Sequence, residues 1–442
     1  MYKRPQKDIQ QSLFFGLADT LNPSHPLFRL ANKINWQKFE DSFMSLYSED
    51  NGRPAKSIRL MVGLILLRHI RNISDESVVL QWQENAYYQY FCGQNEFSIE
   101  PPCNASELVH FRKRIGEDGA RLILEESILV NDDHDDESGK TVYIDSTVQE
   151  KNITFPTDGK LLKKIVHHCK QLSDKYGFTM RQSYTRVLKL IFLDQRFRNN
   201  PRNHKKAIKA DRKLKTIAGR LVRELERNLK GAKMTIHDQM LSLFHRVLEQ
   251  KRTSKDKIYS LHEPEVECIG KGKEHKKYEF GNKVSIARTE GGLIVGAVSF
   301  RKEHDSKTIE GTLEQIEKNI GKLPPRVACD RGYRGIKECK GVPILIPDKP
   351  KKTDTYRQKK KKHKLFCQRA AIEPTIGHIK SDHRMDCNFL KGVVGDAMNA
   401  ILSAAAFNFK RAMNALWAFI VKWIFSINWR ILKTSNLILL PK

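Results

Sequence analysis

The sequence contains no closely spaced cysteine pair, no apolar run long enough to span a bilayer and no internal repeat. Its eight cysteines are scattered and no two have the C-x-x-C spacing, so neither a zinc site nor a disulfide framework is indicated. We expect most of them to be core thiols in a reducing cytosol. The most apolar late stretch, residues 416–427, is interrupted by Lys422 and predicts a packing or partner helix. Residues 1–7 lack the apolar core of a signal peptide.

Acidic residues are scarce relative to basic ones. Lysine and arginine number 79 against 51 aspartates and glutamates, which gives a formal charge of +28. This balance favours a polyanionic partner, because each phosphate that a cation neutralises releases condensed counterions. Nucleic acid is the expected partner, and an anionic membrane surface is the alternative. With 442 residues, the chain is long enough for two or three domains.

Residues 1–130 are predicted to be mainly helical and to form the first domain. Residues 57–71 have an apolar period near 3.6, a break follows with Ser74 as the N-cap, and a second helix covers 76–90. Two helices joined by a tight turn beside basic residues suggest a helix-turn-helix-like DNA-binding unit, with an ordinary helical hairpin as the alternative. These basic residues are Arg53, Lys56, Arg59, Arg68 and Arg71. A further basic helix is predicted over 107–116.

An acidic, polar stretch at 131–139 marks a domain boundary. The stretch that follows it, 140–147, is β-branched and aromatic and predicts a strand that carries Asp145. We expect a second domain over 140–392 and a C-terminal helical segment over 393–442.

A large helical insertion is predicted inside the second domain. From 158 to 252 the apolar residues recur with helical spacing. Within this segment, residues 196–220 hold ten lysines or arginines and a single acidic residue, Asp211. Such one-sided charge favours phosphate contact over a face that is only solvated.

The rest of the second domain alternates strands and helices. The predicted elements are strands at 278–288 and 292–300 joined as a hairpin, a helix at 306–320, and short buried strands at 327–329 and 342–346. This order predicts an α/β fold with one central mixed sheet.

Two segments border the end of this sheet. Residues 349–364 hold nine lysines or arginines together with Pro350, and they predict a mobile loop. A helix of small residues over 396–417 is predicted to cover the sheet or an oligomer partner.

Three carboxylates stand where an α/β sheet collects its ligands. Asp145 lies midway along the first predicted strand, Asp330 ends a short buried strand, and Glu373 follows on a helix. Three converging carboxylates repel one another unless a divalent cation joins them. Mg²⁺ prefers carboxylate oxygens, and two such ions about 3.5 to 4 Å apart promote in-line displacement at phosphorus. Asp145 is the expected bridging ligand.

Two cations accompany Glu373. Arg369, Glu373 and Lys380 are spaced by four and seven residues, so on a continuous helix they share a face and could hold phosphates. The alternative is an amphipathic helix with a surface salt bridge. Pro374 favours a helix that starts near Glu373, which places Arg369 on a preceding turn. Another face carries a predicted buried stripe of Ile372, Ile376 and Ile379.

These blocks, in this order, resemble those of the DDE-type bacterial insertion-sequence transposases, most closely the insertion-sequence-five group. Residues 143–147 resemble the strand of the first aspartate, and 329–334 resemble the second block, an aspartate followed by Gly-Tyr. Arg369-(x3)-Glu373-(x6)-Lys380 is similar to the signature Y-(2)-R-(3)-E-(6)-K, with Phe366 at the tyrosine position. The helical segment at 52–98 resembles the N-terminal domain of the group.

The resemblance implies a ribonuclease-H-like core with a helical insertion and an N-terminal helical domain. It implies Asp145, Asp330 and Glu373 as catalytic ligands of two Mg²⁺ ions, with Mn²⁺ as a substitute. It further implies cleavage at the element's ends, followed by attack of the released 3′-hydroxyl on target DNA. The expected partners are double-stranded DNA, as terminal inverted repeats and target, and further copies of the chain. The DNA- or phosphate-binding residues would be Arg369, Lys380, Tyr333 and Arg334.

Two other functions are compatible with these residues. One is a catalytically inactive DNA-binding protein derived from a transposase, and the other is a metal-dependent endonuclease that cuts without joining. A hydrolase triad is not indicated, because no histidine is placed near Ser146 or Thr147. We expect His167, His168 and His378 to face solvent or to pack, rather than to bind a metal.

Overall fold

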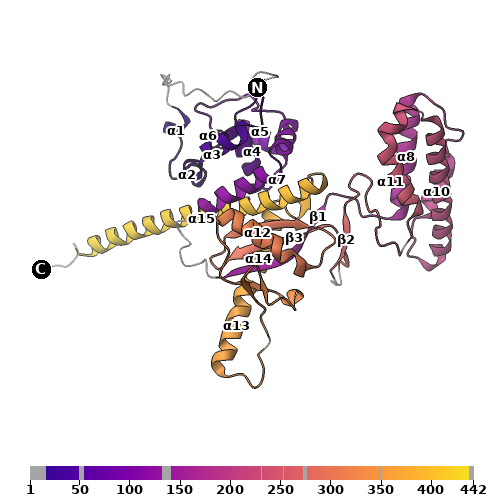
Figure 1. Ribbon diagram of the computed structural model, residues 1–442. Helices are drawn as coiled ribbons and strands as arrows, with labels where there is room; N and C mark the ends of the chain where they lie inside the picture. The colour runs from indigo at the N-terminus through magenta and orange to yellow at the C-terminus, as the bar shows by residue number, and fades with distance from the viewer. Residues whose placement is uncertain are drawn as a thin grey trace. The chain divides into compact units, whose positions relative to one another are not determined.

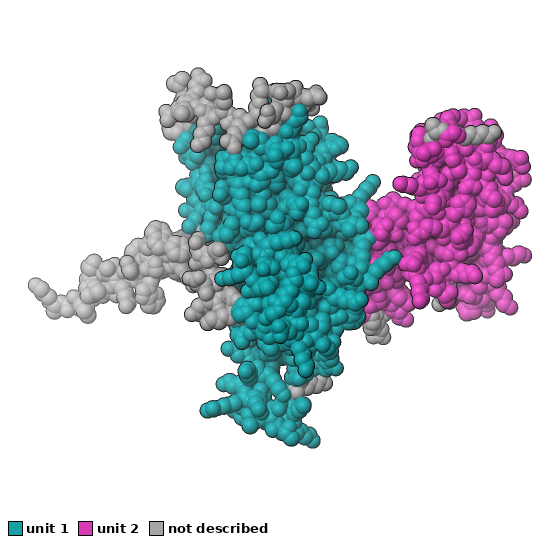
Figure 2. Space-filling model, viewed as in Figure 1, with its two compact units in different colours: residues 1–150, 282–442 teal, residues 151–281 magenta. Residues whose placement is uncertain are grey.

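The computed structural model divides the chain into two compact units (Figures 1 and 2). Unit 1 contains residues 1–150 and 282–442, and unit 2 contains residues 151–281. The described residues are 16–48, 54–131, 141–229, 231–251, 253–271, 276–348 and 350–437, without the side chains of Ala232 and residues 416–437. The predicted linker at 131–139 lies outside them except for Asn131, so the boundary there stays a prediction.

Seven helices precede the sheet within the described part of unit 1. They are α1 (Leu17–Thr20), α2 (Pro26–Lys33), α3 (Trp36–Met44), α4 (Ile58–Ile70), α5 (Asp75–Glu84), α6 (Ala86–Phe91) and α7 (Ala105–Leu129). Ser74 caps α5, as predicted, by accepting a hydrogen bond from the Ser77 amide. The single helix predicted over 76–90 is two helices, because Asn85 is extended (φ −120°, ψ 106°) and its side chain caps α6.

Helix α4 is a core helix, and this corrects the interpretation of its basic residues. Every residue of α4 except Arg59 is buried. Arg59 is half-buried and donates to the carbonyls of Tyr90 and Phe91, while Arg68 is buried beside Asp75. These two cations are therefore not available to phosphates, and the α4–α5 pair packs as a helical hairpin. DNA binding by the N-terminal helices stays a prediction.

The sheet of unit 1 is mixed, which confirms the predicted α/β, ribonuclease-H-like fold class. Its strands are β1 (Val142–Lys151), β3 (Tyr278–Thr289), β4 (Ile294–Phe300), β5 (Val327–Cys329), β6 (Glu338–Cys339), β7 (Val342–Leu345) and β8 (Cys387–Asn388). The order is β3-β1-β5-β7-β6, with β4 on β3 and β8 on β1. The β1–β5 and β5–β7 pairs are parallel, and the β3–β4 hairpin and the β6–β7 pair are antiparallel.

The remaining helices of unit 1 flank this sheet. They are η3 (Asp305–Thr308), α12 (Ile309–Ile320), η4 (Arg331–Tyr333), α13 (Tyr356–Ala370), α14 (Ile372–Asp382) and α15 (Gly392–Leu437). Helices α7, α12 and α15 pack against β4, and α15 also packs along α7 (Figure 1). The helix predicted over 396–417 therefore covers the sheet of its own chain. The side chains of the predicted packing or partner helix at 416–427 lie outside the described residues.

The basic stretch after β7 is not the loop that the sequence predicts. Residues 356–364 belong to helix α13, and Thr355 caps it in a capping box with Gln358. Pro350 precedes this cap by five residues and so interrupts no helical hydrogen bond. Lys349 lies outside the described residues.

Unit 2 contains the helices predicted over 158–252 and one short strand. They are α8 (Asp158–Tyr176), α9 (Thr185–Asp194), α10 (Pro201–Asn228), α11 (Ala232–Glu249) and β2 (Glu267–Gly270). Strand β2 pairs antiparallel with residues 278–281. His167 and His168 are exposed on α8, as expected. In neither unit do the described residues contain a helix long and apolar enough to cross a membrane.

Candidate active site

Asp145 and Asp330 lie side by side on neighbouring parallel strands. Ile144 of β1 is the partner of Cys329 of β5 in the strand register. Asp145 is the next residue of β1, and Asp330, still extended, directly follows the last residue of β5. Two residues that follow a paired position in parallel strands are themselves neighbours. The structure therefore brings together two carboxylates that are 185 positions apart in the sequence.

Alternation along the strands sets the face of the sheet on which both aspartates lie. Ile144 and Cys329 are buried in the main core, whereas Tyr143 and Ala328 are buried in a separate small cluster with Ile372 of α14. Because successive side chains of a strand point to opposite faces, Asp145 shares the face of Tyr143. By the same rule Asp330 shares the face of Ala328, so both carboxylates lie on the α14 side.

The Asp145 carboxylate is largely buried and held from two sides. Its Oδ2 accepts a hydrogen bond from Arg369 Nη2 at 2.9 Å, and its Oδ1 accepts one from the Ser146 amide at 2.8 Å. Only 14% of the side chain is exposed. Burial raises the pKa of the Asp145 carboxyl above its ordinary value; Arg369 opposes this rise and the charge of Asp330 adds to it. The two aspartates are thus electrostatically coupled.

Asp330 opens a tight turn at the end of β5. Its Oδ1 accepts a hydrogen bond from the Gly332 amide at 2.8 Å and so caps the short helix η4. A Cβ at position 332 would stand 3.0 Å from the same oxygen, so the glycine keeps space beside the carboxylate. The side chain of Asp330 is half-exposed and open to a ligand.

Arg369 joins Glu373 to Asp145. Helix α14 starts at Ile372, near the predicted start, and a single helical residue, Ala371 (φ −64°, ψ −13°), separates it from α13. Arg369 Nη1 therefore reaches Glu373 Oε1 at 3.3 Å while Nη2 contacts Asp145. The salt bridge that the sequence analysis gave as the alternative is therefore present, and Asp145 is added to it. Glu373 is 63% exposed, so its bond to Arg369 is weak.

The prediction that Tyr333 binds DNA is wrong. Tyr333 is fully buried in the main core, because the η4 turn directs its ring inward, and it therefore cannot contact DNA. Arg334 is exposed and Lys380 is half-exposed, as contact with a phosphate requires. Phe366, at the position of the signature tyrosine, is 51% exposed.

The other residues of the Glu373 stretch lie largely as predicted. Ile372 and Ile379 are buried and Ile376 is half-buried, so the expected stripe is the packing face of α14. His378 is exposed and contacts Asp382.

The far end of α14 is tied to the N-terminal helices, which the sequence did not indicate. Asn72 Nδ2 donates to the Ser381 carbonyl at 2.7 Å, and His383 Nδ1 is 3.1 Å from the His69 carbonyl. These contacts join residues more than 300 positions apart, and no local pattern could reveal them. The turn after α4 therefore helps to position the helix that carries Glu373.

The three carboxylates are donors of the kind that a divalent cation takes, but they do not converge on one point. Across the described residues, no group of three or more His, Cys, Asp or Glu side chains stands close enough to hold a metal ion. The Arg369 guanidinium, however, bridges Asp145 and Glu373 as a bound cation would, and Asp330 adjoins Asp145. Carboxylate oxygens are the donors that Mg²⁺ prefers. Glu373 is exposed and is the ligand that would have to approach.

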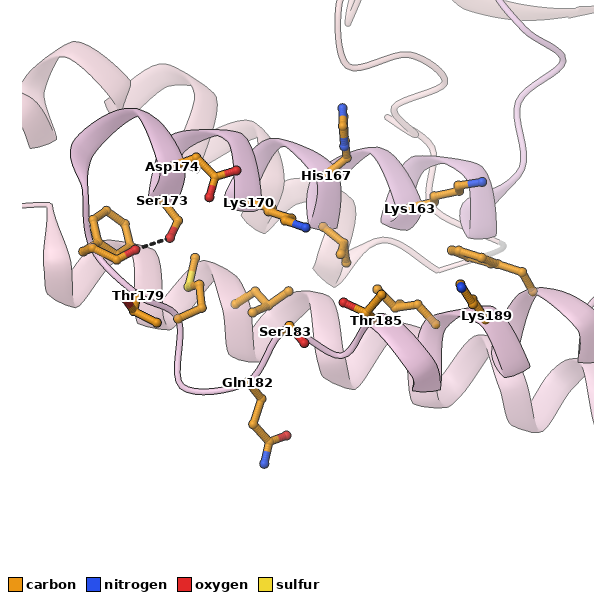
Figure 3. Close-up of a pocket in the computed structure, with 16 residues that line it drawn as sticks. Lys163, His167, Lys170, Ser173, Asp174, Thr179, Gln182, Ser183, Thr185 and Lys189 are labelled. Atoms are coloured by element: carbon orange, nitrogen blue, oxygen red, sulfur yellow. Dashed lines mark hydrogen bonds between the residues drawn. The ribbon is translucent and has the colours of Figure 1, made fainter.

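A cavity of about 450 Å³ lies elsewhere, in unit 2 between α8 and α9 (Figure 3). Its floor is apolar, and Lys163, Lys170 and Lys189 stand along it, with Lys163 Nζ 4.4 Å from the centre of the Phe192 ring. None of the three carboxylates lines it. It adds to the basic surface of the insertion and is not part of the candidate active site.

Known proteins match two parts of the chain. The family described as "Transposase domain (DUF772)" matches residues 16–114, and the family described as "Transposase DDE domain" matches residues 244–409. The second match includes Asp330 and Glu373 but begins after Asp145. "Uncharacterized protein ORF8 in nfe locus" of Rhizobium meliloti is 42% identical over 184 residues, which are 41% of this chain and 88% of the relative. No solved structure matches the chain.

Proposed function

Because this chain belongs to the DDE-type insertion-sequence transposases, we propose that Asp145, Asp330 and Glu373 are the catalytic carboxylates with which it cuts and joins DNA. The reaction proposed is cleavage at the element's ends, followed by attack of the freed 3′-hydroxyl on target DNA. The observation that carries the proposal is the register of β1 and β5, which sets Asp145 beside Asp330 on the face of α14.

We propose two Mg²⁺ ions as the cofactors, with Mn²⁺ able to replace them. Asp145, Asp330 and Glu373 would hold them. When bound, such ions activate the attacking oxygen and stabilise the leaving oxygen of an in-line displacement. The carboxylates themselves contribute fixed negative charge in a strongly basic protein, and this charge concentrates cations at one edge of the sheet.

The cations around the carboxylates have a different role. Arg369 holds Asp145 in place through Nη2, and its planar guanidinium is suited to bind a phosphate in two-point contact. Lys380 and Arg334 offer further charge on α14 and after η4. These three residues would orient the scissile phosphate.

The partner proposed is double-stranded DNA, as terminal repeats and as target, on the bacterial nucleoid. The insertion supports this, because the basic residues of 196–220 are largely exposed on unit 2, whereas Arg198 pairs with Asp211. We further propose that the chain acts as a homo-oligomer on DNA, since two ends must be joined in one reaction.

The proposed function is tested with the DNA that flanks the coding region. Purified protein, Mg²⁺ and a labelled duplex of each flank should give nicks at the element's ends and joined products with a plasmid target. Cuts without joined products would identify an endonuclease instead. Binding without any cut would identify an inactive DNA-binding derivative.

Replacing Arg369 with Ala should weaken strand transfer on the order of a hundredfold, because a positioned charge contact to the phosphate is lost. Folding should lose less than strand transfer does, since Glu373 is exposed and Asp145, although it loses its counter-charge, keeps its bond to the Ser146 amide. Joined product and thermal unfolding would be measured on the same preparations. Arg369→Lys keeps the charge but not the two-point contact, so its strand transfer should lie between that of the wild type and that of Arg369→Ala. If the loss of strand transfer in Arg369→Ala is accounted for by the fraction of protein that is unfolded, Arg369 has a structural role only.

A further inference from the structure

Helix α13 is the most exposed basic element of unit 1 described here, and the inference drawn from it builds on the proposed function. Its 15 residues include seven lysines or arginines and no aspartate or glutamate. None of the 15, all of which the structure describes, is buried. In Figure 1 the helix projects away from the sheet.

The exposed cations of α13 form a stripe. Arg357, Lys360, Lys361 and Lys364 have the spacing i, i+3, i+4 and i+7, which places them on one face of the helix. At 1.5 Å per residue the stripe is about 10 Å long. A DNA strand carries one phosphate per 3.4 Å of helix axis, so about three phosphates of one strand match this length.

The four positive charges of the stripe repel one another. Like charges three and four residues apart destabilise a helix, and a helix of this length is marginal without packing. Only Leu365, near the end of α13, packs against the cluster of Tyr143 and Ile372. A polyanion along the stripe would relieve the repulsion, whereas a second copy of the same stripe would increase it. Charge complementarity therefore selects the DNA backbone as the occupant.

The stripe leads to the candidate active site. Arg369, five residues after Lys364 in the same helix, contacts both Asp145 and Glu373. Gln368 Nε2 donates to Glu290 Oε1 at 2.5 Å, which ties this end of α13 to the β3–β4 turn. We infer that α13 holds the backbone of a DNA strand, independent of its sequence, and guides that strand to the three carboxylates.

The first test compares three variants of the full chain with the wild type. In the stripe variant, Arg357, Lys360, Lys361 and Lys364 become Gln; in a second variant they are exchanged between Lys and Arg. The matched control changes four exposed lysines of the same unit to Gln, and these are Lys307, Lys318, Lys322 and Lys337. Affinity for a duplex of arbitrary sequence is measured by fluorescence anisotropy at several salt concentrations.

The stripe variant should bind at least tenfold more weakly at 0.1 M salt. Its slope of log affinity against log salt should fall by about two to four, since each lost phosphate contact removes about 0.9. The Lys/Arg exchange should keep the wild-type slope. A stripe variant whose slope falls no more than that of the matched control would overturn the inference.

The second test uses Cys367, which lies one turn after Lys364. Of the eight cysteines, all within the described residues, it alone is exposed. Duplex DNA should slow its alkylation by a neutral maleimide several-fold, with the half-buried Cys339 as the internal reference. Vesicles of anionic phospholipid should not slow the alkylation of Cys367. Protection by vesicles and not by DNA would overturn the inference in favour of a membrane surface.

The two proposals can fail separately. In Asp145→Asn the protection of Cys367 by DNA should persist although cleavage is lost. If this variant still cuts DNA while Cys367 is protected, the assignment of Asp145 fails and the role of α13 stands. If cleavage is lost but DNA never protects Cys367, the role of α13 fails and the catalytic assignment stands.

Discussion

Replacing Asp145 with Asn is expected to reduce DNA cleavage by at least about a thousandfold, since a charged ligand beside the reacting phosphate is lost. The amide has nearly the shape of the carboxylate and can still accept a hydrogen bond from the Ser146 amide, as the carboxylate does. The fold should be kept, although the amide nitrogen cannot accept the bond that Arg369 donates to the carboxylate and some stability should be lost. DNA binding should be unchanged or slightly tighter, because one negative charge is removed from a site that receives phosphates.

Cleavage of a labelled flanking duplex, and binding of the same duplex by fluorescence anisotropy, would be measured on the same preparation. Asp330→Asn and Glu373→Gln should show the same loss. The matched control is Asp382→Asn, which removes an exposed carboxylate from the same helix as Glu373 and should keep normal cleavage. Substantial cleavage by any of the three site variants would refute the assignment of that residue.

Replacing Asp75 with Ala is expected to destabilise unit 1 by about 3–5 kcal/mol, because two buried guanidiniums lose their counter-charge. Arg112 Nη1 and Nη2 contact the two Asp75 oxygens at 3.0 and 2.5 Å, and Arg68 Nε lies 2.7 Å from Oδ1. The two arginine side chains are only 3% and 4% exposed. Burial works against the Asp75 charge, but the bond to Arg112 and the charge of Arg68 outweigh it and lower the pKa of Asp75.

Urea unfolding of the full chain measures this loss. Glu76→Ala is the matched control, since Glu76 is the next residue in the first turn of α5 but is exposed. It should cost at most about 1 kcal/mol, the size of a charge effect at a helix N-terminus. If the two variants lose the same free energy of unfolding, burial of the Asp75 charge cluster adds no stability beyond that of an exposed carboxylate at the same helix end.

The same cluster has a functional consequence. It fixes the end of α4 and the turn after it, and these hold the end of α14 through the His69 carbonyl and Asn72. Stability of the N-terminal helices and the position of Glu373 are thereby linked within unit 1. A chain weakened at Asp75 should lose cleavage before it loses the fold.

The two aspartates were predictable from sequence because Asp145 lies within a β-branched, aromatic run and Asp330 directly follows a short buried run. Strand alternation puts each on the same face as the residue two positions before it, and the parallel β1–β5 register then brings the two together. The partner of Asp145 was not predictable. Arg369 reaches it across 224 positions, and only the near-continuous helical path through Ala371 brings both Asp145 and Glu373 within its reach.

Other features depended on three-dimensional context. Tyr333 stands between exposed residues of a polar turn, and its full burial is set by the direction of η4 rather than by any periodicity. The run of lysines at 359–362 and Pro350 favoured a loop, whereas the structure has a helix there. The local signal for this helix is the capping pair of Thr355 and Gln358. Strands of two to four residues, such as β6 and β8, are too short to leave a pattern.

The most direct test of the central claim is to locate the bound cation. Fe²⁺ in place of Mg²⁺, with ascorbate and peroxide, generates hydroxyl radicals that cut the polypeptide beside the ion. We predict cuts next to positions 145, 330 and 373 in the wild-type chain. These cuts should be suppressed by excess Mg²⁺ and lost in Asp145→Asn. Cuts confined to other segments, or an unchanged pattern in Asp145→Asn, would contradict the three carboxylates as the metal site.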